Sequence, residues 1–352
     1  MTRREMIGMA GMIPAALGSA AGLAAATPNR LRIGGTATAF SIRARSMKMS
    51  GQAFNQLEHC RSLGMGGAEE NLPSLEPAAV KEYRKKLESY DMYLSANGLR
   101  LPKDKGDLDQ FERQVRAYSE AGAKTSRLPL TGRRYEVFST FEDFKKHTEQ
   151  SQRSVELAEP VARKYKLKLG VESHKDWRTG DFVDWMKKLS SEWVGVCWDV
   201  GNNIALCEDP MEMLPALAPY CVNVHLKDMG VEEYADGFLL SEVILGQGFL
   251  DLKKIVQTLR GMHPDIVIGL EHITRDPLRV PVYTEKYWTT FTNPSLSPIY
   301  GRDLAHTLAM VRKNLSKTPL PRVEHLSPAE QLKAEDDNIV ACVKYARENL
   351  GL

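Results

Sequence analysis

Four short apolar runs in the second half of the chain each end in a residue type that commonly binds metals. The runs are Leu167–His174, Val194–Asp199, Cys221–His225 and Asp265–Glu271. Because successive side chains of a strand point to opposite faces, Glu172 falls on the face opposite its apolar neighbours. The other runs place Asp199, His225 and Glu271 in the same way. Because all four residues fall on the same strand face, we predict one shared site. Helix caps or solvated loop residues that are unrelated to one another would not all be expected on that face.

Four further strand-like runs precede these, and helical patterns separate the runs. The earlier runs are Leu31–Ala37, Met65–Glu70, Met92–Ala96 and Lys124–Leu128. Apolar residues three and four apart predict helices over Ala78–Tyr90, Leu108–Ala121, Phe141–Tyr165, Phe182–Leu189, Met211–Leu217 and Leu252–Arg260. Asp181, Asp209 and Asp251 are the predicted start signals of the last three.

Eight strand–helix units are the number found in a TIM (β/α)8 barrel, in which sites gather at the C-terminal ends of the strands. An open doubly wound sheet also alternates in this way, but no Gly-x-Gly-x-x-Gly follows the first strand. The predicted fold is therefore an α/β TIM barrel with a C-terminal helical extension.

The barrel is expected over residues 30–275 and the extension over residues 276–352. The stretch from Asp276 to Pro298 is rich in Pro, Tyr, Thr and Trp, and is predicted to form a loop over the barrel mouth. Helices are predicted over Tyr300–Leu315 and Pro328–Leu350, where they would complete the barrel or make an interface. A plain surface extension fits this part of the chain equally well.

The first 26 residues follow a different pattern. Thr2-Arg3-Arg4 leads into a weakly apolar stretch that ends in Ala24-Ala25-Ala26, and this resembles a twin-arginine export signal with a small-residue cleavage site. A retained apolar anchor is the alternative, although its many Gly residues make a poor spanning helix. We expect a periplasmic or otherwise exported protein without stable membrane insertion after cleavage.

Composition narrows the range of partners. The chain has 352 residues and a formal net charge of +2, with its Lys and Arg interleaved among 45 acidic residues. No nucleic-acid surface is expected from this pattern. The five cysteines include no Cys-x-x-Cys spacing, so they are expected to be buried thiols without a disulfide framework.

At the level of motifs, the chain resembles the xylose isomerase-like TIM-barrel superfamily, the sugar phosphate isomerase/epimerase group. The motifs that carry the resemblance are Gly170–His174, Cys197–Asn202, Val224–Asp228, Leu245–Gly248 and Gly269–Glu271, with weaker similarity from Gly34 onward. They cover the second half of the expected barrel.

The resemblance implies one divalent ion held by Glu172, Asp199, His225 and Glu271. Independently, three carboxylates and one imidazole form a hard, oxygen-rich site that suits Mn²⁺ best, with Mg²⁺, Co²⁺ or Zn²⁺ as substitutes. In the family two glutamates remove and return a proton, and this catalytic role carries over to Glu172 and Glu271.

Departures from the family pattern limit the assignment of a substrate. Ketose 3-epimerases have a His and an Arg where this chain has Asn202 and Val231. His174 and Lys227 instead fall on the inward parity, so His174, Asn202 and Lys227 are the predicted substrate-binding residues. Lys227 could alternatively pair with a carboxylate at the rim. Asp228 and His272 have the opposite parity and are left out of the site.

The expected function is that of a metal-dependent sugar isomerase or epimerase, which abstracts a proton next to a carbonyl and passes through an enediolate. The alternative is a dehydratase or lyase on a keto-sugar such as a 3-keto-glycoside or an inosose, because the same enediolate can expel a leaving group. A sugar-binding protein without catalysis ranks last, since all four ligand residues are present. The expected partner is a small sugar or keto-sugar, and a homo-oligomer is left open.

Overall fold

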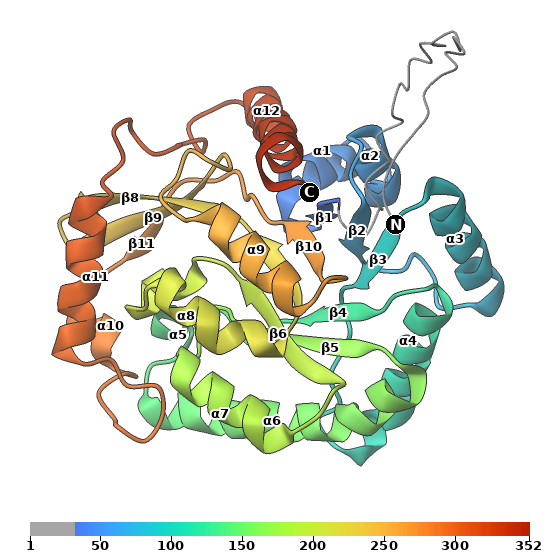
Figure 1. Cartoon of the computed structure of the whole chain (residues 1–352), viewed down its shortest axis with the longest axis horizontal. Helices are drawn as coiled ribbons and strands as arrows, with labels where there is room; N and C mark the ends of the chain where they lie inside the picture. The colour runs from blue at the N-terminus through green and yellow to red at the C-terminus, as the bar shows by residue number, and fades with distance from the viewer. Residues whose placement is uncertain (1–31) are drawn as a thin grey trace, which may run out of the picture.

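Eight parallel strands close into a barrel in the computed structural model, which describes residues 32–352 (Figure 1). The strands are β1 (Gly34–Thr36), β2 (Gly67–Glu70), β3 (Tyr93–Ala96), β4 (Thr125–Leu128), β5 (Lys168–Glu172), β6 (Val194–Asp199), β7 (Cys221–Leu226) and β10 (Val267–Leu270). β1 pairs with both β2 and β10, which closes the ring. The eight predicted strands and the TIM barrel are confirmed.

Helices cover the outside of the barrel, and the six predicted between strands are confirmed with small shifts at their ends. They are α3 (Pro77–Tyr90), α4 (Leu108–Glu120), α6 (Phe141–Tyr165), α7 (Thr179–Leu189), α8 (Pro210–Leu217) and α9 (Leu252–Met262). Asp209 and Asp251 cap α8 and α9 by accepting backbone N–H groups. The predicted start of α7 was wrong, because Asp181 lies inside its first turn and accepts hydrogen bonds from Ser297 instead.

Four shorter helices were not predicted. They are α1 (Ser41–Met49) and α2 (Gln56–Ser62) between β1 and β2, α5 (Arg134–Val137) and α10 (Glu285–Trp288). In α1 the one buried residue is Ile42. An apolar stripe that narrow gives no helical periodicity to detect in the sequence.

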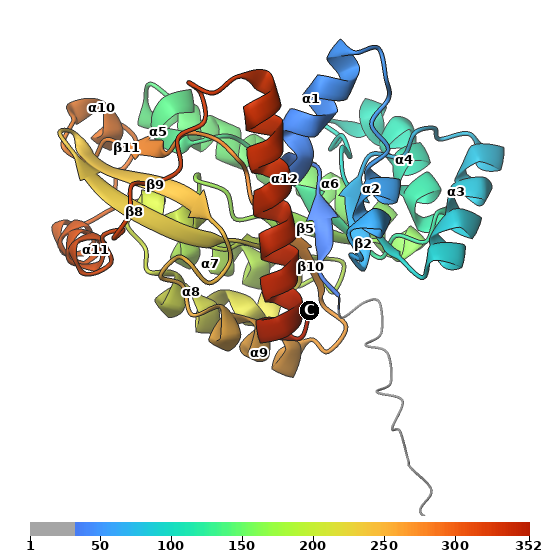
Figure 2. The ribbon, with the colours of Figure 1, turned by 90° about the horizontal axis from the view of Figure 1, so that it is seen from above.

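A three-stranded antiparallel sheet is attached at the end of β7. It contains β8 (Asp228–Tyr234), β9 (Gly237–Val243) and β11 (Leu278–Val280). The prediction of a loop over residues 276–298 was therefore wrong in part, since β11 pairs with β9 and α10 follows. The sheet and α10 lie on one side of the molecule and α2 to α4 on the other (Figure 2).

Two C-terminal helices end the chain, α11 (Gly301–Lys313) and α12 (Pro328–Tyr345), and α12 continues in a π-helical turn over Ala346–Leu350. α12 lies alongside α1 (Figure 2). The buried Glu335 of α12 accepts the N–H groups of Ile42 and Arg43 at 2.7 and 2.8 Å. A carboxylate at a helix N-terminus satisfies free donors and the helix dipole, so this contact joins the last helix to the first.

The expected signal sequence, residues 1–26, lies outside the described residues. Among residues 32–352, no helix combines the length and the apolar character that a membrane span requires. The five cysteines are buried and free of disulfides, as predicted.

Candidate metal centre

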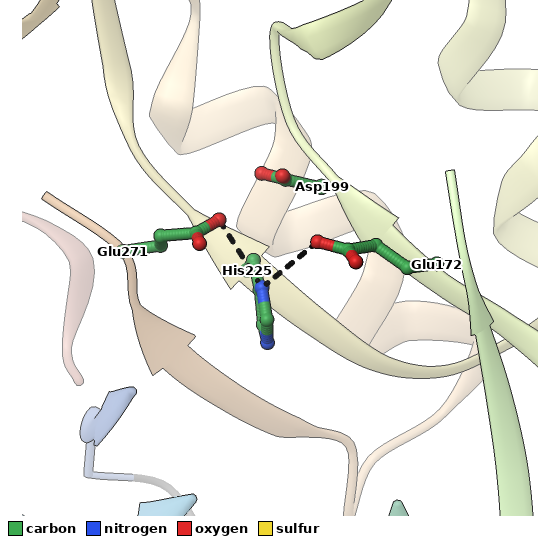
Figure 3. A group of neighbouring side chains, drawn as sticks. All are labelled: Glu172, Asp199, His225 and Glu271. Atoms are coloured by element: carbon green, nitrogen blue, oxygen red, sulfur yellow. Dashed lines mark hydrogen bonds and ion pairs between the residues drawn. The ribbon is translucent and has the colours of Figure 1, made fainter. Parts of the chain in front are cut away.

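The four predicted ligand residues meet at the C-terminal end of the barrel. Glu172 ends β5, Asp199 ends β6, His225 lies near the end of β7 and Glu271 directly follows β10. One ligand atom from each lies within 4.8 Å of all the others, and their side chains point toward one another (Figure 3). Strand register explains the meeting, because Asp199 pairs with His225 across the β6–β7 ladder.

This set of side chains fits a divalent cation. All four residues are buried, none more than 2% exposed. Glu172 Oε2 and Asp199 Oδ1 have basic side chains as neighbours, with Arg127 Nη2 at 2.9 Å and Lys227 Nζ at 2.7 Å. Three carboxylates with one imidazole are ligands for Mn²⁺, Mg²⁺ or Zn²⁺.

The His225 ring is oriented by carboxylates on both of its nitrogens. Nδ1 lies 3.2 Å from Glu271 Oε2 and 3.8 Å from Glu172 Oε1, and Nε2 lies 2.9 Å from Glu69 Oε2. Nδ1 therefore faces the ligand group, and Nε2 faces away from it toward β2. Burial opposes a charge on the ring, but Cys197, Glu69 and Glu271 together raise the pKa of His225 well above its usual value.

Lys227 lies within the ligand group and not at the rim, where the sequence alternative placed it. Its ammonium is 2.7 Å from Asp199 Oδ1 and 3.0 Å from Glu271 Oε2, and the residue is 1% exposed. Burial would raise the pKa of Glu271, but Lys227 and His225 hold it well below its usual value. For Asp199 the balance reverses, because burial and Glu271 outweigh Lys227 and raise the pKa.

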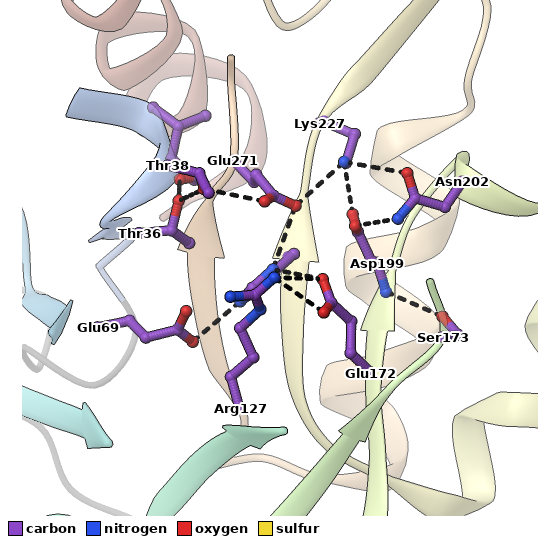
Figure 4. Close-up of polar contacts among 12 residues, drawn as sticks. Thr36, Thr38, Glu69, Arg127, Glu172, Ser173, Asp199, Asn202, Lys227 and Glu271 are labelled. Carbon is purple, nitrogen blue, oxygen red and sulfur yellow. Dashed lines mark hydrogen bonds and ion pairs between the residues drawn. The ribbon is translucent and has the colours of Figure 1, made fainter. Parts of the chain in front are cut away.

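Arg127 is a site residue that the sequence reasoning missed. It projects from β4, and its Nη2 lies 2.9 Å from Glu172 Oε2 (Figure 4). Burial would raise the pKa of Glu172, but Arg127 and His174 lower it. Glu69 on β2 was missed too. Glu69 and Arg127 both lie near strand ends, where the alternation of inward and outward side chains could have identified them.

The remaining predicted residues occupy different places around the ligands. Asn202 is buried, donates to Asp199 and accepts from Lys175 and Lys227, so it positions two members of the site. His174 follows the end of β5, and burial together with Lys175 lowers its pKa to about 4, which leaves the ring neutral. Its Nδ1 is buried without a hydrogen-bond partner among the described residues.

Asp228 has a structural role next to the site. Its carboxylate accepts the backbone N–H groups of Gly246, Gly248 and Leu250 at 2.9, 2.9 and 3.2 Å. The Leu245–Gly248 motif is therefore held against Asp228, the residue that follows Lys227. A Cβ at Gly248 would lie 2.2 Å from Asp228 Oδ1, so this close approach requires glycine. His272 Nδ1 donates to Val243 O, and neither Asp228 nor His272 joins the ligand group, as predicted.

The comparisons with known proteins agree with this fold. Residues 57–289 match the family described as xylose isomerase-like TIM barrel. A 115-residue stretch is 33% identical to the 3-oxo-isoapionate decarboxylase of Pectobacterium atrosepticum, covering 32% of this chain and 42% of that protein. A second stretch, 25% identical over 173 residues, covers 49% of this chain and 48% of the protein YihM of Escherichia coli. The matches thus span less than half the length of either relative.

Among solved structures, a xylose isomerase-like TIM barrel protein from Mycobacterium smegmatis, in complex with magnesium, aligns with a TM-score of 0.50 at 17% identity. The alignment covers 79% of this chain and 97% of that one, and it shows a shared fold. Because the family match extends over more than half of the chain and the barrel is closed as the family requires, the chain belongs to the xylose isomerase-like TIM barrel family.

Proposed function

We propose that this chain is a divalent-metal-dependent sugar isomerase or epimerase that removes and returns a proton next to a carbonyl. The observation that carries the proposal is the placement of Glu172 and Glu271 on either side of His225 (Figure 3). Two carboxylates that face one point from two sides can exchange protons with opposite faces of a bound carbon centre.

Glu172, Asp199, His225 and Glu271 are the residues that would hold the ion. A divalent ion there would polarise a carbonyl oxygen and make the neighbouring C–H more acidic. Mn²⁺ suits the donor set, and the magnesium complex of the Mycobacterium smegmatis protein supports Mg²⁺ as the alternative.

The surrounding side chains keep the two glutamates ready to accept a proton. Arg127 lies beside Glu172 and Lys227 beside Glu271, and the pKa of each glutamate is lowered, so both are ionised at neutral pH. Thr38 donates to Glu271 Oε1 at 2.9 Å and fixes its rotation. Lys227, a buried ammonium, would also stabilise negative charge that develops on a substrate oxygen.

A lyase acting on a keto-sugar is the second candidate. The match to a decarboxylase supports it, since decarboxylation and β-elimination both pass through the same enolate chemistry as epimerisation. Lys227 would then have a further role, because its ammonium could protonate a leaving oxygen or the enolate itself.

The deciding experiment incubates metal-loaded protein with a panel of free ketoses, 3-keto-glycosides and keto-acids in deuterated water. We expect deuterium at the carbon next to the carbonyl, with unchanged product mass apart from deuterium for an isomerase, and loss of water or carbon dioxide for a lyase. Glu172→Gln and Glu271→Gln should each reduce turnover by about 10²–10⁴-fold at saturating Mn²⁺.

Glu88→Gln, an exposed change in a surface ion pair, is the matched control and should retain turnover. Complete retention of the original hydrogen in a converted epimerisation substrate would exclude proton exchange and contradict the roles of both glutamates.

A further inference from the structure

We infer that the substrate carries a carboxylate group and that Arg127 is the residue that binds it. This inference rests on the proposed function and adds the chemical class of its substrate. It depends on three observations: the charges around the ligand group, the bonding of the Arg127 guanidinium and the partial exposure of that side chain.

The charge balance calls for an anion once a divalent ion is present. As metal ligands, His225 would be neutral and Asp199 ionised. In that state five carboxylates and four basic side chains surround the centre, which leaves one negative charge before the ion is counted; the carboxylates are Glu69, Glu172, Asp199, Glu242 and Glu271, and the bases are Arg127, Lys175, Lys227 and Arg275. A divalent ion reverses this deficit into an excess of one positive charge. An uncompensated charge in a buried site is costly, so a bound monoanion is favoured.

The Arg127 guanidinium has an N–H donor that forms no hydrogen bond within the described residues. Its Nη2 serves Glu172, whereas its Nε is buried and has no hydrogen-bond partner among residues 32–352. A guanidinium holds its N–H groups in a fork that matches the two oxygens of a carboxylate.

The position of Arg127 distinguishes it from Lys227. Arg127 and Lys227 lie on different sides of the ligand group (Figure 4). The Arg127 side chain is 17% exposed, while the Lys227 side chain is 1% exposed and already has two carboxylates within 3.0 Å. The more exposed Arg127 guanidinium is therefore the better placed of the two to receive an incoming carboxylate, because the Lys227 charge is already paired with Asp199 and Glu271.

A carboxylate fits better than a phosphate. One surplus charge matches a monoanion, whereas a phosphate ester carries about −1.5 to −2 at neutral pH and would bring back a negative excess. The substrate class assigned here is accordingly a sugar acid with a carbonyl, and a sugar phosphate is an explicit alternative in the test.

The test measures binding without turnover, by calorimetry on Mn²⁺-loaded protein. The probes are erythronate, erythritol and erythritol phosphate, which share a four-carbon chain and lack a ketone or aldehyde group. We expect erythronate to bind at least about 10-fold more tightly than erythritol, because a charge-assisted pair contributes that much. Arg127→Gln should abolish the preference and Arg127→Lys should retain part of it. The control Arg84→Gln, at an exposed ion pair with Glu88, should leave it unchanged.

Each outcome has a defined meaning once metal content and thermal melting confirm that every variant is loaded and folded. Equal affinity for erythronate and erythritol would overturn the inference, and so would an unchanged preference in Arg127→Gln, which indicates carboxylate binding to the metal alone. Tighter binding of the phosphate would assign a phosphorylated substrate instead. Failure to bind any divalent metal would contradict the proposed function itself, which keeps the two failures distinct.

Discussion

Glu69 and His225 are 156 residues apart in the chain, yet the Glu69 carboxylate lies 2.9 Å from His225 Nε2. β2 carries the carboxylate and β7 the ring, so the contact crosses the inside of the barrel. A carboxylate on the far nitrogen of a ligating histidine fixes its tautomer and increases its basicity. A neutral His225 ring with its proton on Nε2 would present the Nδ1 lone pair to an ion held by the other three ligand residues.

Glu69→Gln should lower the affinity for Mn²⁺ by about 10–100-fold, because an amide cannot support the same tautomer as strongly. Calorimetric titration of the metal-free protein measures the effect. Glu70→Gln is the matched control, since the neighbouring Glu70 bonds Tyr83 and makes no contact with His225. Equal metal affinity in Glu69→Gln and Glu70→Gln would show that Glu69 does not support the ligand.

Removing His225 should cost most of the metal affinity, because it is the one imidazole in the group of four. Elemental analysis of His225→Ala after dialysis should find well under one equivalent of divalent metal. A surface group of Asp209, Glu212 and His306 could bind a second ion, so His306→Ala serves as the background variant. A full equivalent retained by a variant that lacks Asp199, His225 and His306 would remove the basis for the site.

The ligand residues could be found from sequence because local rules place them. Alternation along β5, β6, β7 and β10 puts each ligand on the inner face, and barrel closure brings the strand ends together without further information. The same rule applied to β2 and β4 would have drawn attention to Glu69 and Arg127. Those strands have small and polar residues, such as Gly67-Ala-Glu-Glu, and their alternation is weak.

Other parts of the structure depend on long-range pairing, which no local pattern reveals. β11 pairs with β9 across about 40 intervening residues, so a three-residue strand in a Pro-rich stretch reads as a loop. Lys227 could be assigned to the inner face from sequence. Its ion pairs with Asp199 and Glu271 could not, because they depend on how closely the ends of β6, β7 and β10 approach one another. The capping of α1 by Glu335 likewise joins opposite ends of the chain.

Asp228→Asn should destabilise the fold by about 2–4 kcal/mol, because the buried carboxylate accepts three loop N–H groups and an amide oxygen cannot replace both of its oxygens. Urea unfolding measures the change. Asp251→Asn is the control: it caps α9, and Asn caps equally well, so its effect should be near zero. Equal stability of the two variants would mean that the Leu245–Gly248 loop is held by other contacts.

We propose that the protein is exported by the twin-arginine route, from the motif at Arg3 and Arg4. Replacing both by Lys should keep the protein in the cytoplasm, and N-terminal sequencing of the exported wild-type form should begin near Thr27. Fractionation followed by immunoblotting measures the distribution. Soluble periplasmic protein that still begins at residue 1 would contradict the proposal.

Asp176 should make the stability depend on pH in a direction opposite to that of most carboxylates. Burial raises its pKa to about 8, so the folded state keeps a proton that the unfolded chain releases near pH 4. Between these values unfolding releases a proton, and stability therefore falls as the pH rises, by up to about 1.4 kcal/mol per pH unit. Asp176→Asn is neutral at every pH and lacks this dependence.

The measurement is urea unfolding of the wild type and Asp176→Asn in a chelating buffer at pH 5, 6.5 and 8. Contributions from other titrating groups cancel in the difference between the two proteins. The wild type should lose stability relative to the variant as the pH rises, because the buried carboxyl must either stay protonated or carry an unpaired charge. A difference that stays constant from pH 5 to pH 8 would mean that the Asp176 carboxylate ionises without cost, with a cation such as Arg134, whose charge already acts on it, as its partner.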